Sequence, residues 1–154
     1  MKGMVLYVVI LPIAIYLCAR WFDQRLHNHG SRRLLVMACL TFSLSAFLPS
    51  PIINGTDTQF WTHFVGGGMF CGMIWLYFRR SFGVRAWWVE LCIVYTLTSA
   101  LGVLNELYEL FAFVYLDAYP VTDTSWDLLA NSSGAVTFYI LYKTSAFLND
   151  RHKN

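Results

Sequence analysis

Four ionisable side chains lie in stretches of this chain that are otherwise apolar enough to cross a membrane. They are His63, Glu106, Glu109 and Asp127. An ionisable group at bilayer depth destabilises the protein unless it is paired, hydrated or used. A chain that keeps four such groups is therefore predicted to use them, and we take them as the candidate catalytic residues.

Three further polar residues accompany the four, and we take them as candidates for binding a substrate: Asn105, Asp123 and Asn131. Residues three or four apart share one face of a helix. Glu106 and Glu109 therefore share a face, and Asp127 shares another with Asn131. The spacing predicts two polar faces on two apolar helices.

These residue types support three kinds of chemistry. His63, Glu106, Glu109 and Asp127 form a candidate metal site, since carboxylate oxygens suit Mg²⁺, Mn²⁺ or Ca²⁺ and imidazole widens the choice. Alternatively, one of several crowded, desolvated carboxylates stays protonated and acts as a general acid beside an ionised base. Both schemes suit cleavage or transfer at a phosphate-bearing lipid headgroup. The third option is proton or cation binding without chemistry.

Each of these residues also has a purely structural interpretation. His63 and Asn131 can hydrogen-bond between helices. Asp127 stands near the start of an apolar run, where the helix dipole stabilises an anion. Glu90 lies at the other end of its run near Arg85, and we interpret it as an interface ion pair.

Five apolar runs must position these residues. The runs cover residues 4–20, 34–49, 60–78, 87–115 and 126–148. Their lengths are near the ~20 residues that a helix needs to cross the hydrocarbon core, and they lack the alternation of barrel strands. The 154 residues are only 13% charged, against about 25% in a soluble domain. We expect a single domain over residues 1–154: an all-α integral membrane bundle of five transmembrane helices.

The Lys and Arg residues predict the orientation of the bundle. If all five runs span the membrane, ten of the eleven Lys and Arg residues lie on one side of it, in the segments that follow runs one, three and five. Only Lys2 lies on the other side. The positive-inside rule then places the N-terminus outside and the C-terminus in the cytoplasm, in a multi-pass inner-membrane protein. A net charge of +2 does not argue for nucleic acid. The expected partners are membrane lipids, with a partner membrane protein or a homodimer as further options.

Small residues lie on the same helix faces as the polar ones in runs three, four and five. They are Gly66 and Gly67 beside His63, Gly102 beside the two glutamates, and Gly134 beside Asp127 and Asn131. Small residues let helices approach closely, and polar residues hydrogen-bond across the contact. We therefore expect these three runs to pack together, with their polar groups converging near the outer surface.

Three segments resemble the VanZ-like family and the related YjdF-like inner-membrane proteins of bacteria. They are His63-Phe64, Glu106-Leu-Tyr-Glu109, and the stretch from Asp123 through Asp127-Leu-Leu-Ala-Asn131-Ser-Ser-Gly134-Ala. Members carry a His-Phe on one helix, a Glu-rich stretch on the next and an Asp-x-x-x-Asn-x-x-Gly-Ala stretch on the last. The resemblance covers roughly residues 57–140. It implies a small bacterial inner-membrane protein in envelope biology, without naming a reaction.

The chain departs from the family pattern at two places. Gln59 stands four residues before His63, where the family often has an acid. No Arg occurs between Glu109 and Lys143, where the family often has one. If that Arg binds an anionic headgroup in the relatives, this chain lacks that contact.

The working hypothesis is a VanZ-like membrane protein whose outer-leaflet-facing acidic and histidine pocket binds or acts on a polar or phosphorylated lipid headgroup. Glu106 and Glu109 would be acid–base or metal-binding groups, and a divalent cation is the candidate cofactor. His63 would be a ligand or proton carrier, while Asp127 and Asn131 would orient the substrate. Whether the site is catalytic is left open. The alternatives are a non-catalytic accessory subunit of a membrane complex and a small proton- or cation-coupled transporter.

Overall fold

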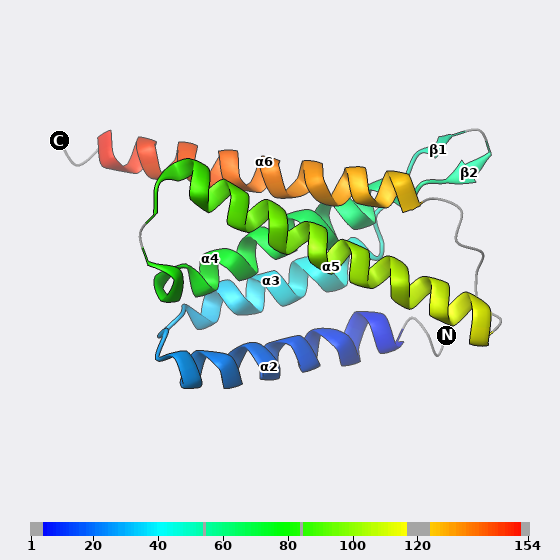
Figure 1. Ribbon diagram of the computed structural model, residues 1–154, viewed down its shortest axis with the longest axis horizontal. Helices are drawn as coiled ribbons and strands as arrows, with labels where there is room; N and C mark the ends of the chain where they lie inside the picture. Colours follow the sequence, from blue (N-terminus) through cyan, green and yellow to red (C-terminus); the bar gives the residue numbers. More distant parts are fainter. Residues whose placement is uncertain (1–4, 54, 84, 117–123, 152–154) are drawn as a thin grey trace.

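The chain folds into an elongated bundle of helices, shown in Figure 1 as a computed structural model that describes residues 5–53, 55–83, 85–116 and 124–151. Five continuous helices occur in this part of the chain. They are η1 (Leu6–Ile10) with α2 (Leu11–Leu26), α3 (Arg32–Ser45), η2 (Thr62–Met69) with α4 (Phe70–Phe82), α5 (Trp87–Leu116) and α6 (Thr124–Arg151), where η marks π-helical segments. The prediction of an all-α chain is confirmed.

Among the described helices, α5 alone is long and apolar enough to cross a membrane by length and composition. The qualifying stretch is Trp87–Phe111, and only 22% of its most apolar window is buried inside the bundle. The structure thus supports one membrane-spanning helix.

The helix ends differ from the predicted runs by a few residues, for local reasons. α2 continues past residue 20 because Arg20 and Asp23, one turn apart, form an ion pair. It ends where His27 adopts a left-handed conformation with φ of 48°, a common helix stop. α3 ends at Ser45, shortly before Pro49, since a residue preceding proline disfavours helical geometry.

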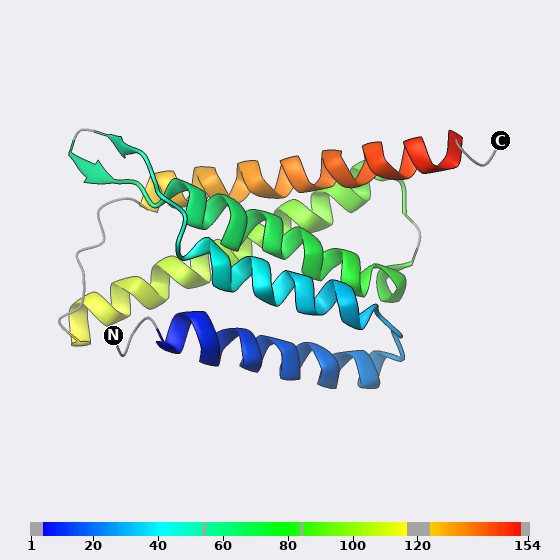
Figure 2. The same ribbon diagram turned by 180° about the vertical axis from the view of Figure 1, so that it is seen from behind.

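The helix formed by η2 and α4 lies between the other helices. Figures 1 and 2 show α6 and α2 at opposite edges of the bundle, with α3 and α4 between them. On one side α4 packs against α2 and α3 around the buried residues Ala19, Leu35, Cys39 and Tyr77. On the other side it packs against α5 and α6 around Trp75, Val94, Ala135 and Tyr139. Residues from α4 therefore enter both halves of the core.

The helices η2 and α6 approach closely because glycines line their contact. A Cβ at Gly68 would overlap the backbone of Asn131 and Ala135, and one at Gly134 would overlap the carbonyl of Phe64. The α-helical spacing predicted Gly66 and Gly67 on the His63 face and did not predict Gly68. In a π-helix the hydrogen bonds run from i to i+5, so His63 aligns with Gly68.

A short hairpin precedes η2. β1 (Ile52–Ile53) pairs antiparallel with β2 (Thr56–Asp57), and Ile52 lies opposite Asp57. Gly55 takes a positive φ of 81° at the turn, which glycine adopts without strain. Thr58 is buried and donates its hydroxyl to the carbonyl of Pro51 at 2.9 Å. This contact fixes the chain where it enters the helix that carries His63.

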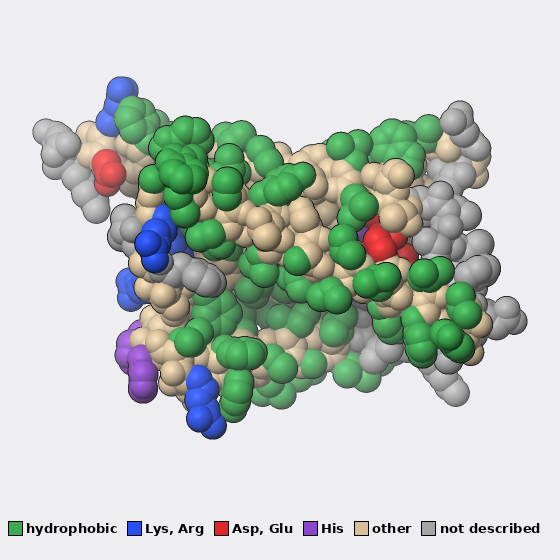
Figure 3. Space-filling model, viewed as in Figure 1, with side chains coloured by type: hydrophobic (Ala, Val, Ile, Leu, Met, Phe, Trp, Pro, Cys, Tyr) green, Lys and Arg blue, Asp and Glu red, His purple; other side chains and the backbone are tan. Residues whose placement is uncertain are grey.

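Large apolar side chains cover the outside of the bundle. Four of the five helices expose them, as at Leu17, Leu44, Leu104 and Ile140, whereas the described apolar side chains of η2 and α4 are at least partly buried. Figure 3 shows apolar side chains across the middle of one face, with basic side chains and histidine gathered at one end. We call this end, where α4 and α6 finish, the basic end, and we call the opposite end, where α5 finishes and α6 begins, the site end.

Candidate functional site

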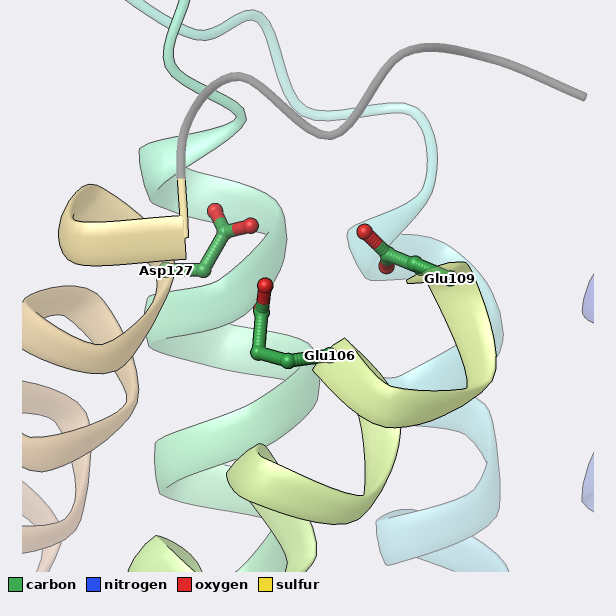
Figure 4. A group of neighbouring side chains, drawn as sticks. All are labelled: Glu106, Glu109 and Asp127. Atoms are coloured by element: carbon green, nitrogen blue, oxygen red, sulfur yellow. The ribbon is translucent and has the colours of Figure 1, made fainter. Parts of the chain in front are cut away.

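Three carboxylates meet at the site end. Glu106 and Glu109 lie on the last turns of α5, and Asp127 lies on the first turn of α6. Figure 4 shows the three side chains directed toward a common space between the two helices. One oxygen from each lies within 4.8 Å of one oxygen from the others. The structure thus brings Asp127 to two acids that lie 18 and 21 residues earlier in the sequence.

Glu106 is the least compensated of the three carboxylates. The residue is 9% exposed, and both carboxylate oxygens are shielded from solvent. Neither oxygen has a hydrogen-bond partner among the described residues. Buried polar groups are normally hydrogen-bonded, and an exception calls for a physical explanation such as a ligand.

Asp127 is held against His63. The Nε2 atom of His63 lies 3.3 Å from Oδ1 of Asp127, which is 1% exposed. Asp127 also stands in the first turn of α6, where the helix dipole favours an anion. The functional and structural interpretations of Asp127 are therefore compatible. His63 contacts a member of the carboxylate group rather than the space that the three carboxylates share.

Asn105 supports Glu109. Its Nδ2 donates to Oε1 of Glu109 at 2.6 Å, across one turn of α5. Asn105 was a candidate for binding substrate, and in the structure its amide contacts a carboxylate of the cluster. This contact limits how Glu109 can turn, as hydrogen bonds to metal-ligating carboxylates do.

Asn131 lies beneath the carboxylates, between η2 and α5. It is 3% exposed, and its side chain fills the space beside Gly67 and Gly102. Its Oδ1 has no hydrogen-bond partner among the described residues. Asp123, the remaining candidate for binding substrate, lies outside the described residues.

Glu90 belongs to the basic end, as its position at the start of α5 predicted. Its carboxylate accepts hydrogen bonds from Nε of Arg79 at 2.8 Å and from Nζ of Lys143 at 2.6 Å. The hydroxyl of Tyr139 lies 3.3 Å away. Glu90 is only 1% exposed, so the predicted ion pair is a buried network that joins α4, α5 and α6.

The site end therefore offers an oxygen-rich group of ligands, a histidine–carboxylate pair and a buried carboxylate without a partner. Oxygen ligands of this kind suit hard divalent cations. A histidine held by a carboxylate is the usual arrangement of a proton carrier. No protein family, curated protein or solved structure matches the chain, so the geometry itself carries the functional argument.

Proposed function

We propose that this chain is a VanZ-like integral membrane protein whose site end binds a polar or phosphorylated lipid headgroup and acts on it in envelope biology. Five helices would span the inner membrane, with the N-terminus outside and the C-terminus in the cytoplasm. The observation that carries the proposal is the buried carboxylate of Glu106, which has no hydrogen-bond partner among the described residues.

The exposed apolar side chains support a lipid environment for the four helices that surround η2 and α4. On α5, Leu104 is 60% exposed and Val114 is 58% exposed. A soluble monomer rarely shows apolar patches larger than a few hundred Å², whereas lipid-facing helices carry apolar side chains by necessity. The other helices meet the length and hydropathy expected of a membrane span less clearly than α5 does. Several of them are short, and two begin with π-helical segments.

The charges support the orientation. The segments 34–78 and 86–142 contain no Lys or Arg. The basic residues of the described helices, including Arg25, Arg79, Lys143 and Arg151, lie toward the basic end. That end would face the cytoplasm, and the carboxylates at the site end would then face the outer leaflet.

The site has the groups that acid–base chemistry at a phosphoester needs. One carboxylate would take the proton from an attacking water or hydroxyl, and a second group would return a proton to the leaving oxygen. His63, held by Asp127, is suited to the second role. Glu106 and Glu109 face the same space as Asp127 and are suited to the first role.

The apolar core argues against the transporter alternative. Between the two ends, α4, α5 and α6 pack around Trp75, Val94 and Ala135, each at most 1% exposed. A transport path would need polar groups at this depth. An accessory subunit would instead co-purify with a stoichiometric partner in mild detergent.

The test compares membrane lipids from bacterial cells that produce the wild type, Glu106→Gln or Glu109→Gln. Mass spectrometry should show a headgroup change with the wild type that is lost with both variants, while each variant remains folded in the membrane. Asp57→Asn is the matched control, since this exposed acid lies at the same end on β2. A headgroup change that persists in both glutamine variants would falsify the proposal.

A further inference from the structure

We infer that Glu106, Glu109 and Asp127 bind one hard divalent cation. This inference rests on the proposed function, because the cation would lie where a headgroup phosphate is proposed to bind. It names the ligand that links the carboxylates of the protein to an anionic substrate.

The geometry of the three carboxylates is that of ligands around a single ion. Their oxygens lie within 4.8 Å of one another. Ca²⁺ binds oxygens at about 2.3–2.6 Å, so two oxygens on opposite sides of one ion are about 4.6–5.2 Å apart. Mg²⁺ binds oxygens at about 2.0–2.1 Å, so its opposite ligands are about 4.0–4.2 Å apart and fall within the same limit. The spacing therefore suits one hard divalent cation, and Ca²⁺ is the probe ion for it.

The unpartnered carboxylate of Glu106 is the second and independent observation. The residue is nine-tenths buried, its oxygens have no partner among the described residues, and its side chain points into the space between Asp127 and Glu109. Buried carboxylates elsewhere in this bundle are satisfied by the protein itself. Asp23 accepts from the backbone of Gly30, and Glu90 binds Arg79.

The segment that carries the carboxylates supplies no Lys or Arg to compensate them. No Lys or Arg occurs in residues 86–142, which include all three carboxylates. His63 pairs with Asp127 and interacts electrostatically with Glu106, but it is not one of the three groups whose oxygens face one another. A bound cation would offset the carboxylates together, and the low dielectric of the site strengthens that attraction.

The surrounding residues orient the ligands. His63 contacts Asp127 at 3.3 Å, and Asn105 donates to Glu109 at 2.6 Å. Contacts of this kind fix the carboxylates that coordinate a metal. Three protein carboxylates leave coordination positions open on Ca²⁺, which takes six to eight oxygens. Water and one phosphate oxygen of a headgroup would fill them.

The experiment measures Ca²⁺ binding to the full chain in a neutral, phosphate-free detergent after treatment with a chelator. Calorimetry should show one saturable Ca²⁺ site per chain, and Ca²⁺ should raise the unfolding temperature. Glu106→Gln should weaken binding by at least about tenfold, because affinity follows the number of charged ligands. Asp57→Asn should bind as the wild type does. If Glu106→Gln does not fold, Glu109→Gln gives the same test from the half-buried ligand.

The outcomes separate this inference from the proposed function. Absence of saturable binding of Ca²⁺, Mg²⁺ and Mn²⁺, or equal binding by the wild type and Glu106→Gln, would overturn it. The lipid assay, repeated on purified protein with and without chelator, provides the second arm. A headgroup reaction that depends on Glu106 and has the same rate with and without chelator would contradict the cation site and would be consistent with the proposed function. Glu106-dependent Ca²⁺ binding without any headgroup reaction supports the cation and counts against the function.

Discussion

The two ends of the bundle treat a buried glutamate in opposite ways. At the basic end, Glu90 is 1% exposed and pairs with Arg79 at 2.7 Å and Lys143 at 2.6 Å. At the site end, Glu106 is 9% exposed and neither oxygen has a partner among the described residues. Both glutamates lie on α5, in similarly apolar sequence. The two side chains are buried to a similar degree, and they differ in whether basic side chains hydrogen-bond to the carboxylate.

This difference separates a structural acid from a candidate functional one. Glu90 joins three helices through contacts that the chain supplies, so its role is complete within the fold. Breaking such a network by removing one partner leaves the other charges uncompensated. Glu106 makes no hydrogen bond among the described residues and interacts electrostatically with His63, so a bound ligand would complete its contacts.

The largest expected effect is the contrast between two equivalent substitutions. Glu90→Gln should lower the free energy of unfolding by about 2–4 kcal/mol, because Arg79 and Lys143 lose their counter-charge. Glu106→Gln, measured without added cation, should leave stability unchanged or raise it, because the buried charge that it removes has no hydrogen-bond partner among the described residues. Thermal and denaturant unfolding in the same detergent measure both changes. Equal losses in the two variants would show that Glu106 is also structural.

Close packing at the site end gives the next effect. Gly68→Ala should lower stability by about 1–3 kcal/mol, because the added methyl group meets backbone atoms of α6 that cannot turn aside. It should also separate His63 from Asp127. Gly72→Ala is the control, since the atoms nearest to its Cβ would belong to the side chain of Phe138 and not to the backbone. If the unfolding temperature falls equally in both variants, contact with the backbone of α6 is not what excludes a side chain at Gly68.

Two asparagines extend the comparison between the basic end and the site end. Asn28 is 4% exposed and donates to Oδ1 of Asp23 and to the carbonyl of Tyr77. Asn28→Ala should lower stability by about 1–2 kcal/mol, since it leaves buried acceptors unsatisfied. Asn105→Ala should change stability less and instead weaken Ca²⁺ binding by about 10-fold or more, through the loss of its contact with Glu109. Calorimetry and unfolding, run on both variants, separate the two roles.

The smallest expected effect concerns acidification of the basic end. Burial acts to raise the pKa of Asp23, but hydrogen bonds from Gly30, Asn28 and Tyr77 and the charge of Arg20 hold the pKa below its ordinary value of 3.8. A carboxyl group whose folded pKa is depressed stabilises the fold above its unfolded pKa and loses that contribution as the pH falls through the folded value.

The stability difference between the wild type and Asp23→Asn should therefore be constant from about pH 5 to 7 and shrink below about pH 4. Unfolding temperatures at each pH measure this difference. A difference that instead grows on acidification would mean that Asp23 is not ionised in the folded protein.

The helices were predictable because long apolar runs determine them locally. The residues on α6 that face the bundle, Asp127, Asn131 and Gly134, follow directly from helical spacing. Gly68 was missed because the π-helical η2 changes which residues share a face, and hydropathy does not report that change. Asp23 was also missed as a buried residue, because its partners come from a loop and from α4.

The sequence by itself determined that the chain is helical, that its basic residues lie in a few segments, and which apolar runs carry His63, Glu106, Glu109 and Asp127. These properties depend on residue type and on spacing within one helix. Only the tertiary structure decided that Glu90 is neutralised by Arg79 and Lys143 while Glu106 has no hydrogen-bond partner among the described residues. Partners across helices depend on how far each helix is rotated and displaced against its neighbours. Packing of the whole bundle sets those quantities, and no single segment encodes them.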